Sequence, residues 1–391
     1  MTAVARFAAI PVFLFFFFIL TGVHFEMPGL LRFYPEIVLF GASLVGVALV
    51  AERSELAMDL WACGLCLAVV PILSSLASGR EAELFSQPEY RSWVSCLLMG
   101  GPLALVFGQA DRRKGLFLLL ATVAATVILL FLYHYLVLHE VREFDLRPLL
   151  NTKNGDPNFL CTIFGFFIPL LAHWGLEHRW TWAVVIPLFG CAILTQSRMG
   201  LIALGLSSVY WVWTLGPRYR FVKTISGGLL FVALGVLLLN PNLRSRFRTI
   251  HDTANLERIQ TYRNGLKLFS ENPILGVGWG HAPDTFFQNG GYPAFQSDHT
   301  PLEIHMTPLQ IAAELGFVGL LAFGWLIGIV LRSFRQARDP LLLHASVASV
   351  LCLGLNSLTL PLATKDFFVV FLFIVAVLNQ ATGVTNEVIS K

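Results

Sequence analysis

Residues 115–138 read GLFLLLATVAATVILLFLYHYLVL and contain no Asp, Glu, Lys or Arg. A helix needs about 20 mostly apolar residues to cross the hydrocarbon core of a bilayer. The strands of an outer-membrane barrel alternate apolar and polar residues instead, and residues 116–132 do not alternate at all. This stretch therefore predicts a transmembrane helix.

The rest of the chain has the same character. Of its 391 residues, 56% are hydrophobic and 13% are charged, and the mean hydropathy is +0.69. Because a soluble domain has about 25% charged residues, this composition excludes a soluble globular enzyme and a disordered or fibrous chain. We expect an all-α polytopic membrane protein with about twelve transmembrane helices. The predicted spans are residues 7–23, 36–51, 57–78, 92–110, 115–138, 158–174, 180–195, 199–215, 221–239, 308–331, 341–363 and 366–382.

The distribution of Lys and Arg predicts the orientation. Twelve spans put both termini on one side. With the termini in the cytoplasm, the inside segments hold 13 basic residues and the short outside loops hold 8. Positively charged loops tend to stay in the cytoplasm, so we expect this orientation. The chain then divides into transmembrane helices 1–9 (residues 1–239), one long external loop (240–307), and transmembrane helices 10–12 with a cytoplasmic C-terminus (308–391).

Arginines on the external side are the first candidates for a functional site. Arg198 lies between two apolar stretches with almost no loop, and an arginine at such a boundary is usually paired or functional. Arg258 and Arg263 lie in a polar, helical part of the long loop. They are five residues apart, so they point in different directions on a helix. A guanidinium group binds phosphate oxygens in bidentate fashion, so these residues are candidates for an anion site.

His305 is the candidate general base. It precedes the span that opens at Pro308, and a neutral histidine there can accept a proton from a hydroxyl group. The alternative is that His305 only caps or packs the start of that span. His299 and His281 are rival bases on the same loop.

Metal and nucleotide sites are not expected. The segment Gly276-Val277-Gly278-Trp279-Gly280 follows no predicted strand, so it does not fit a dinucleotide-binding loop. We expect its glycines to form tight backbone turns near the membrane surface. The chain has no Asp-x-Asp and no His-Glu-x-x-His motif. We therefore expect no metal and no other cofactor, with arginines neutralising negative charge instead.

Three segments together resemble the O-antigen ligase and polymerase superfamily of bacterial envelope enzymes. The segments are TQSRMG (195–200), RIQTYRNGL (258–266) with NPILGVG (272–278), and HMTPLQIAAELGFVG (305–319). Asp156-Pro157-Asn158 is also similar to the family. The resemblance covers about residues 155–320, and the expected spans and single long loop fit the whole chain.

The resemblance implies a membrane-embedded glycosyltransferase of the GT-C type. It would transfer a glycan from an undecaprenyl diphosphate carrier, without a metal and with inversion. Arg198 and Arg258 match the arginines expected to hold the donor diphosphate, and Arg263 and Arg80 are further candidates for that role. His305 matches the histidine proposed as general base. The enzyme would lie in the bacterial inner membrane, in contact with membrane lipids and not with nucleic acid, and its active site would face the periplasm.

Several functions remain open after this comparison. An O-antigen ligase, which joins the glycan to lipid A–core, is the first expectation. A polysaccharide polymerase or an O-linked protein oligosaccharyltransferase would use the same donor, and the motifs do not distinguish the acceptors. A lipid or sugar transporter, which is not an enzyme, is a further hypothesis. It would predict internal repeats and ionisable residues near the middle of the bilayer.

Overall fold

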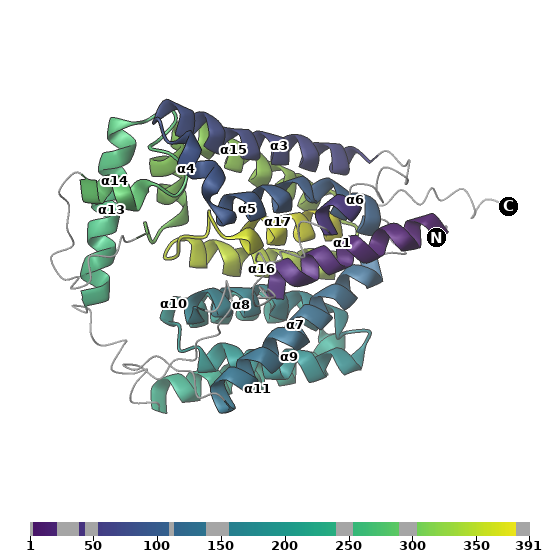
Figure 1. Ribbon diagram of the computed structural model, residues 1–391. Helices are drawn as coiled ribbons and strands as arrows, with labels where there is room; N and C mark the ends of the chain where they lie inside the picture. Colours follow the sequence, from purple (N-terminus) through teal and green to yellow (C-terminus); the bar gives the residue numbers. More distant parts are fainter. Residues whose placement is uncertain are drawn as a thin grey trace.

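The computed structural model describes residues 3–21, 39–43, 54–108, 113–137, 156–239, 253–288 and 303–380. The regular structure in these ranges is helical (Figure 1), which confirms the expected all-α fold. The helices are α1 (Ala3–Thr21), α3 (Glu55–Ala77), α4 (Glu81–Ser86), α5 (Pro88–Leu98), α6 (Gly100–Phe107), α7 (Arg113–Leu136), α8 (Pro157–Trp174), η1 (Arg179–Thr181), α9 (Trp182–Leu194), α10 (Arg198–Thr214), η2 (Pro217–Tyr219), α11 (Arg220–Leu239), α13 (Thr253–Glu271), α14 (Ala282–Gln288), α15 (Thr307–Gln336), α16 (Pro340–Ser357) and α17 (Asp366–Asn379).

The chain is a polytopic membrane protein. Within the described residues, 6 segments are long and apolar enough to cross a membrane: Glu55–Ala77, Glu89–Phe107, Arg113–Leu136, Pro157–Trp174, Thr307–Gln336 and Pro340–Ser357. Shorter apolar helices accompany them at Ala9–Thr21, Arg179–Leu194 and Asp366–Asn379. The predicted spans at 199–215 and 221–239 coincide with α10 and α11, and the one at 36–51 lies mostly outside the described residues. The total of about twelve stays a prediction.

The short helix α17 lies at the centre of the bundle. Every residue from Asp366 to Asn379 is buried, as is typical of a helix that is apolar all round. The ring of Phe371 stacks on that of Phe166 in α8, with 3.9 Å between the centroids. Figure 1 shows α3, α5 and α15 on one side of α17 and α8 to α11 on the other. The side chains of this 14-residue helix therefore contact neighbouring helices rather than lipid.

The helices α13 and α14 lie across one end of the bundle, away from the start of α1 (Figure 1). They belong to the long loop that the sequence predicts between residues 240 and 307. The polar helix expected there is observed as α13, which begins at Thr253 and packs against α15.

The helix α15 is interrupted at Gly316. This residue has φ 65° and ψ −159°, far from helical values. The N–H groups of the next two residues, Phe317 and Val318, donate to the carbonyl oxygens of Pro273 (2.8 Å) and Ile274 (3.2 Å). The break in α15 is thus bonded to the loop that follows α13.

The same loop bonds to the other side of the break. The N–H groups of Val277 and Gly278 donate to the carbonyl oxygens of Ala313 and Glu314, each at 3.0 Å. In a continuous helix these two oxygens would accept from the residues four positions later. Helix and loop therefore exchange backbone partners, which satisfies polar groups that a break inside a membrane segment would otherwise leave unbonded.

Three glycines give this loop its tight turns, as the sequence predicted. Gly276, Gly278 and Gly280 have φ values of 73°, 103° and 71°. Residues with a Cβ rarely adopt these values, whereas glycine does so without steric cost.

Candidate active site

Four helices begin close together at the end of the bundle that α13 covers. These are α8 at Pro157, α10 at Arg198, α15 at Thr307 and α17 at Asp366. The N-terminus of a helix carries partial positive charge and N–H groups without intrahelical partners, so it favours anions. The starts of α10 and α15 therefore favour a negative ligand, whereas Asp156 at the N-cap of α8 and Asp366 in the first turn of α17 offset the partial charge of their own helices.

Side chains join these helix starts to one another. The Ser197 hydroxyl, at the N-cap of α10, donates to Oδ1 of Asn158 in the first turn of α8 (2.8 Å). Lys365 is the N-cap residue of α17, and its Nζ lies 4.9 Å from the ring centroid of Phe159 on α8. The same ammonium group lies 3.6 Å from Oε1 of Glu303, shortly before α15.

His305 is held in the neutral form that a general base requires. Its Nδ1 lies 2.8 Å from the carbonyl oxygen of Glu303. A carbonyl only accepts, so Nδ1 carries the proton and Nε2 keeps its lone pair. Burial lowers the pKa of His305 below its ordinary value, and the Arg258 charge lowers it further. The hydrogen bond to the Glu303 carbonyl and the charges of Glu303 and Asp156 oppose this shift.

The helix α13 places Arg258 beside His305. Arg258 and Tyr262 are one turn apart and share a face of the helix. The Tyr262 hydroxyl donates to the backbone oxygen of His305 at 3.0 Å. Burial raises the pKa of Tyr262, and the nearby Arg258 charge lowers it. The structure therefore brings together Arg258 and His305, which are distant in the sequence.

Arg198 opens α10 directly after a tight turn. Gln196 has φ 51°, a value that costs free energy for a residue other than glycine. Ser197 caps α10 by accepting a hydrogen bond from Gly200 N at 3.3 Å. The helices α10 and α8 approach so closely that a Cβ on Gly200 of α10 would lie 2.5 Å from the Cys161 sulfur of α8. Arg198 is thereby fixed beside the first turn of α8.

Arg263 lies on the same helix as Arg258 but on another face. The five-residue separation corresponds to a rotation of about 140° around the helix axis, and Arg263 is exposed. The structure does not place Arg263 with His305. Its assignment to the donor diphosphate stays a prediction.

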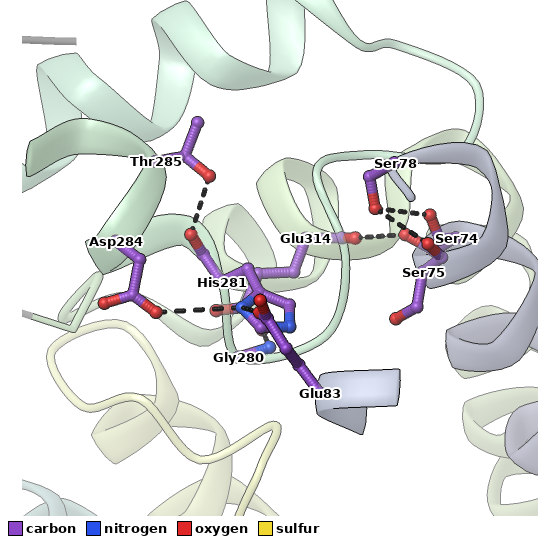
Figure 2. Close-up of polar contacts among 9 residues, drawn as sticks. All are labelled: Ser74, Ser75, Ser78, Glu83, Gly280, His281, Asp284, Thr285 and Glu314. Atoms are coloured by element: carbon purple, nitrogen blue, oxygen red, sulfur yellow. Dashed lines mark hydrogen bonds and ion pairs between the residues drawn. The ribbon is translucent and has the colours of Figure 1, made fainter. Parts of the chain in front are cut away.

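Arg80 lies near His281, in a second polar cluster. His281 Nδ1 lies 3.5 Å from Oε2 of Glu83 and 3.7 Å from Oδ2 of Asp284, as Figure 2 shows. Burial lowers the pKa of His281, the Arg80 charge lowers it too, and the two carboxylates oppose this shift. The structure thus places Arg80 with His281 rather than with His305, and its role as a diphosphate ligand stays a prediction.

Glu314 fastens this second cluster to α15. Its Oε2 accepts from Gly280 N at 3.0 Å, and its backbone oxygen accepts from the Ser74 hydroxyl of α3 at 2.7 Å (Figure 2). The rival base His281 therefore lies among contacts that tie α3, the loop and α15 together. The other rival, His299, lies outside the described residues.

Sequence reasoning does not single out Lys365 or Glu303. Lys365 nevertheless has a signal like that of Arg198, because it also lies in a tight turn between two apolar stretches on the predicted external side. Glu303 has no such signal, since it belongs to a long polar loop. Glu303 contributes through its carbonyl oxygen, which accepts from His305, and its carboxylate, which pairs with Lys365. Only the fold brings these groups together.

The positive groups of the site are guanidinium groups, an ammonium group and helix N-termini. Such groups bind phosphate oxygens directly. In the part of the chain that the structure describes, no group of three or more His, Cys, Asp or Glu residues is arranged to hold a metal ion.

Comparison with known families agrees with the resemblance seen in the sequence. Residues 183–324 match the family model Wzy_C, described as O-antigen ligase. The matched segment includes Arg198, Arg258, Arg263 and His305. A search of curated proteins finds no match for the chain.

Proposed function

We propose, from the match of residues 183–324 to the O-antigen ligase family, that this chain transfers polysaccharide from undecaprenyl diphosphate to lipid A–core in lipopolysaccharide biosynthesis. The family indicates an enzyme that ligates or polymerises polysaccharides. The observation that carries the proposal is that α13, which bears Arg258, is bonded through Tyr262 to His305 at the point where α8, α10, α15 and α17 begin.

The donor diphosphate is the leaving group of this reaction. Arg198 and Arg258 bind its oxygens and stabilise the negative charge that grows as the bond to the sugar C1 breaks. The starts of α10 and α15 at the same place add fixed positive potential. Arginine suits this role because it stays charged and presents a planar pair of donors.

His305 activates the acceptor. The acceptor hydroxyl oxygen attacks C1 on the face opposite the diphosphate, and its proton passes to Nε2 of His305. One C–O bond forms while the bond to the diphosphate breaks, so the anomeric centre inverts. General base catalysis of this kind contributes about 10²–10⁴-fold to the rate.

The active site faces the periplasm in this proposal. The bias in Lys and Arg favours cytoplasmic termini, and with this orientation the end of the bundle covered by α13 lies outside. The undecaprenyl chain of the donor then lies among the spans of the inner membrane. A polymerase or an O-linked protein oligosaccharyltransferase would use the same donor chemistry with a different acceptor.

A transporter has less support. A transporter would carry ionisable residues near the middle of the bilayer, whereas the buried acidic residues Glu314 and Asp366 lie near the starts of α15 and α17, and Glu314 accepts a hydrogen bond from Gly280 N in the long loop. This contact fixes the carboxylate at the break in α15.

The decisive experiment gives the purified protein one donor and three acceptors in lipid nanodiscs. The donor is an undecaprenyl-diphosphate-linked glycan. The acceptors are lipid A–core, a second carrier-linked unit and a Ser/Thr-containing peptide. We expect the product on lipid A–core, with an inverted linkage. Elongation of the second carrier-linked unit alone would identify a polymerase, and no product with any acceptor would reject the transferase.

A further inference from the structure

Lys365 is a cation to which the reaction outlined above assigns no role. It lies between α16 and α17, and its side chain is only 21% exposed. The ammonium group lies over the ring of Phe159, in the first turn of α8. Lys365 therefore reaches the same helix start that Arg198 flanks from α10.

The ion pair of Lys365 with Glu303 is loose. Their charged atoms are 3.6 Å apart, which is beyond the usual length of a charge-assisted hydrogen bond. An ammonium group has three donors, and one distant carboxylate does not engage them well. A stronger acceptor that entered the site would compete with Glu303 for Lys365.

The backbone around Lys365 also favours an anion. The helix α17 has no side-chain cap at its N-terminus, and neither does α15. By contrast, Asp156 caps α8 and Ser197 caps α10. The two helix starts flank the Lys365–Glu303 pair. The N–H groups at the start of α15 favour a negatively charged ligand, whereas the buried Asp366 in the first turn of α17 offsets the partial charge of that helix.

We propose that Lys365 is a third cation of the donor diphosphate site and that Glu303 is its counter-ion while the site is empty. This inference rests on the proposed function. The diphosphate oxygens then bind the ammonium group in place of Glu303, and the guanidinium groups of Arg198 on α10 and Arg258 on α13 bind the same diphosphate. Glu303 keeps its backbone bond to His305 throughout, so the base stays oriented.

The test measures binding of undecaprenyl diphosphate, without a glycan, to the full-length protein in nanodiscs. Lys365→Ala should raise Kd about tenfold or more, the loss expected for one charge-assisted contact, while Lys365→Arg stays near the wild-type value. Glu303→Gln should bind as tightly as wild type or more tightly, because the competing carboxylate is gone. Lys267→Ala is the matched control, since Lys267 is an exposed lysine of α13 that pairs only loosely with Glu271, at 3.9 Å.

The two variants at the ion pair separate this proposal from a structural role. If the pair only supports the fold, Lys365→Ala and Glu303→Gln should lower the melting temperature alike and leave Kd unchanged, and this result would overturn the proposal. A higher Kd for Lys365→Ala together with an unchanged or lower Kd for Glu303→Gln would support it even if Lys365→Ala folds poorly. Lack of binding by the wild-type protein would instead reject the diphosphate donor, and with it the proposed function.

Discussion

Gly276 and Gly316 hold the long loop against the break of α15, because neither position has room for a side chain. A Cβ at Gly276 would lie 2.3 Å from the carbonyl carbon of Glu314, and one at Gly316 would lie 2.3 Å from the carbonyl carbon of Ile274. The N-terminal part of α15 follows His305, and the loop follows α13, which carries Arg258. The contact between the two glycines therefore helps to set the position of the arginine relative to the histidine.

Gly316→Ala should destabilise the protein by about 2–4 kcal/mol, because it adds a steric clash to an unfavourable φ. The measurement is the midpoint of thermal or chemical unfolding in detergent. Gly324→Ala is the matched control in the same helix, since nothing lies within 4 Å of a Cβ there. Equal unfolding midpoints for the two variants would show that the close contact between the loop and the break at Gly316 does not contribute to stability.

His305→Ala should reduce transfer by about 10²–10⁴-fold and leave donor binding nearly intact, because it removes the base and no phosphate ligand. Turnover per folded molecule and Kd for undecaprenyl diphosphate are the two measurements. His281→Ala is the comparison, and it should lower stability while turnover of the folded fraction stays within a few-fold. Normal turnover of folded His305→Ala would end the assignment of the base.

The pH dependence of transfer should report the lowered pKa of His305. The ordinary value is 6.5, and burial and Arg258 both lower it. The base thus stays neutral down to a pH below 6.5, and kcat/KM should fall only as the pH drops further. Arg258→Gln removes a charge that lowers this pKa, so the acid limb of its residual activity should move to higher pH. A limb that stays in place, as expected for Lys267→Gln, would contradict the proximity of Arg258 and His305.

The arginines should differ in their response to lysine. Arg198→Lys and Arg258→Lys keep the charge but lose the bidentate fork, so each should weaken donor binding about tenfold or more. Arg263→Lys should have a smaller effect, because Arg263 is exposed on another face of α13. Titration with undecaprenyl diphosphate gives the ranking. An Arg263 effect as large as that of Arg258 would require α13 to turn when the donor binds.

Cysteine labelling of intact cells should establish the orientation. Glu271→Cys, at the exposed end of α13, should react with an impermeant maleimide, whereas Gln336→Cys, at the opposite end of α15, should react only after lysis. The native thiols give little background, because five of the six are buried and Cys66 is half-buried. The reverse pattern would place the site in the cytoplasm and reject the proposed function.

The sequence by itself determines the all-helical, membrane-embedded character of this protein. In the absence of water the backbone must bond within each segment, so stretches such as 115–138 can only be helices. Local chemistry also predicts the turns at Gly276, Gly278 and Gly280, because positive φ values depend on the residue itself and its neighbours. The turn that holds Arg198 is visible for another reason, because two apolar stretches leave almost no loop between them.

Only the tertiary structure decides which distant residues meet. Packing of α13 on α15 places Arg258 beside His305, the segment before α17 brings Lys365 to Glu303, and Arg80 lies with His281 instead. The hydrophobic pattern of a helix indicates which of its faces is buried, but it does not indicate which other helix packs against that face. The sequence shows a glycine at position 316 but does not show that the loop after α13 bonds to the break there, because the exchanged hydrogen bonds join backbone groups.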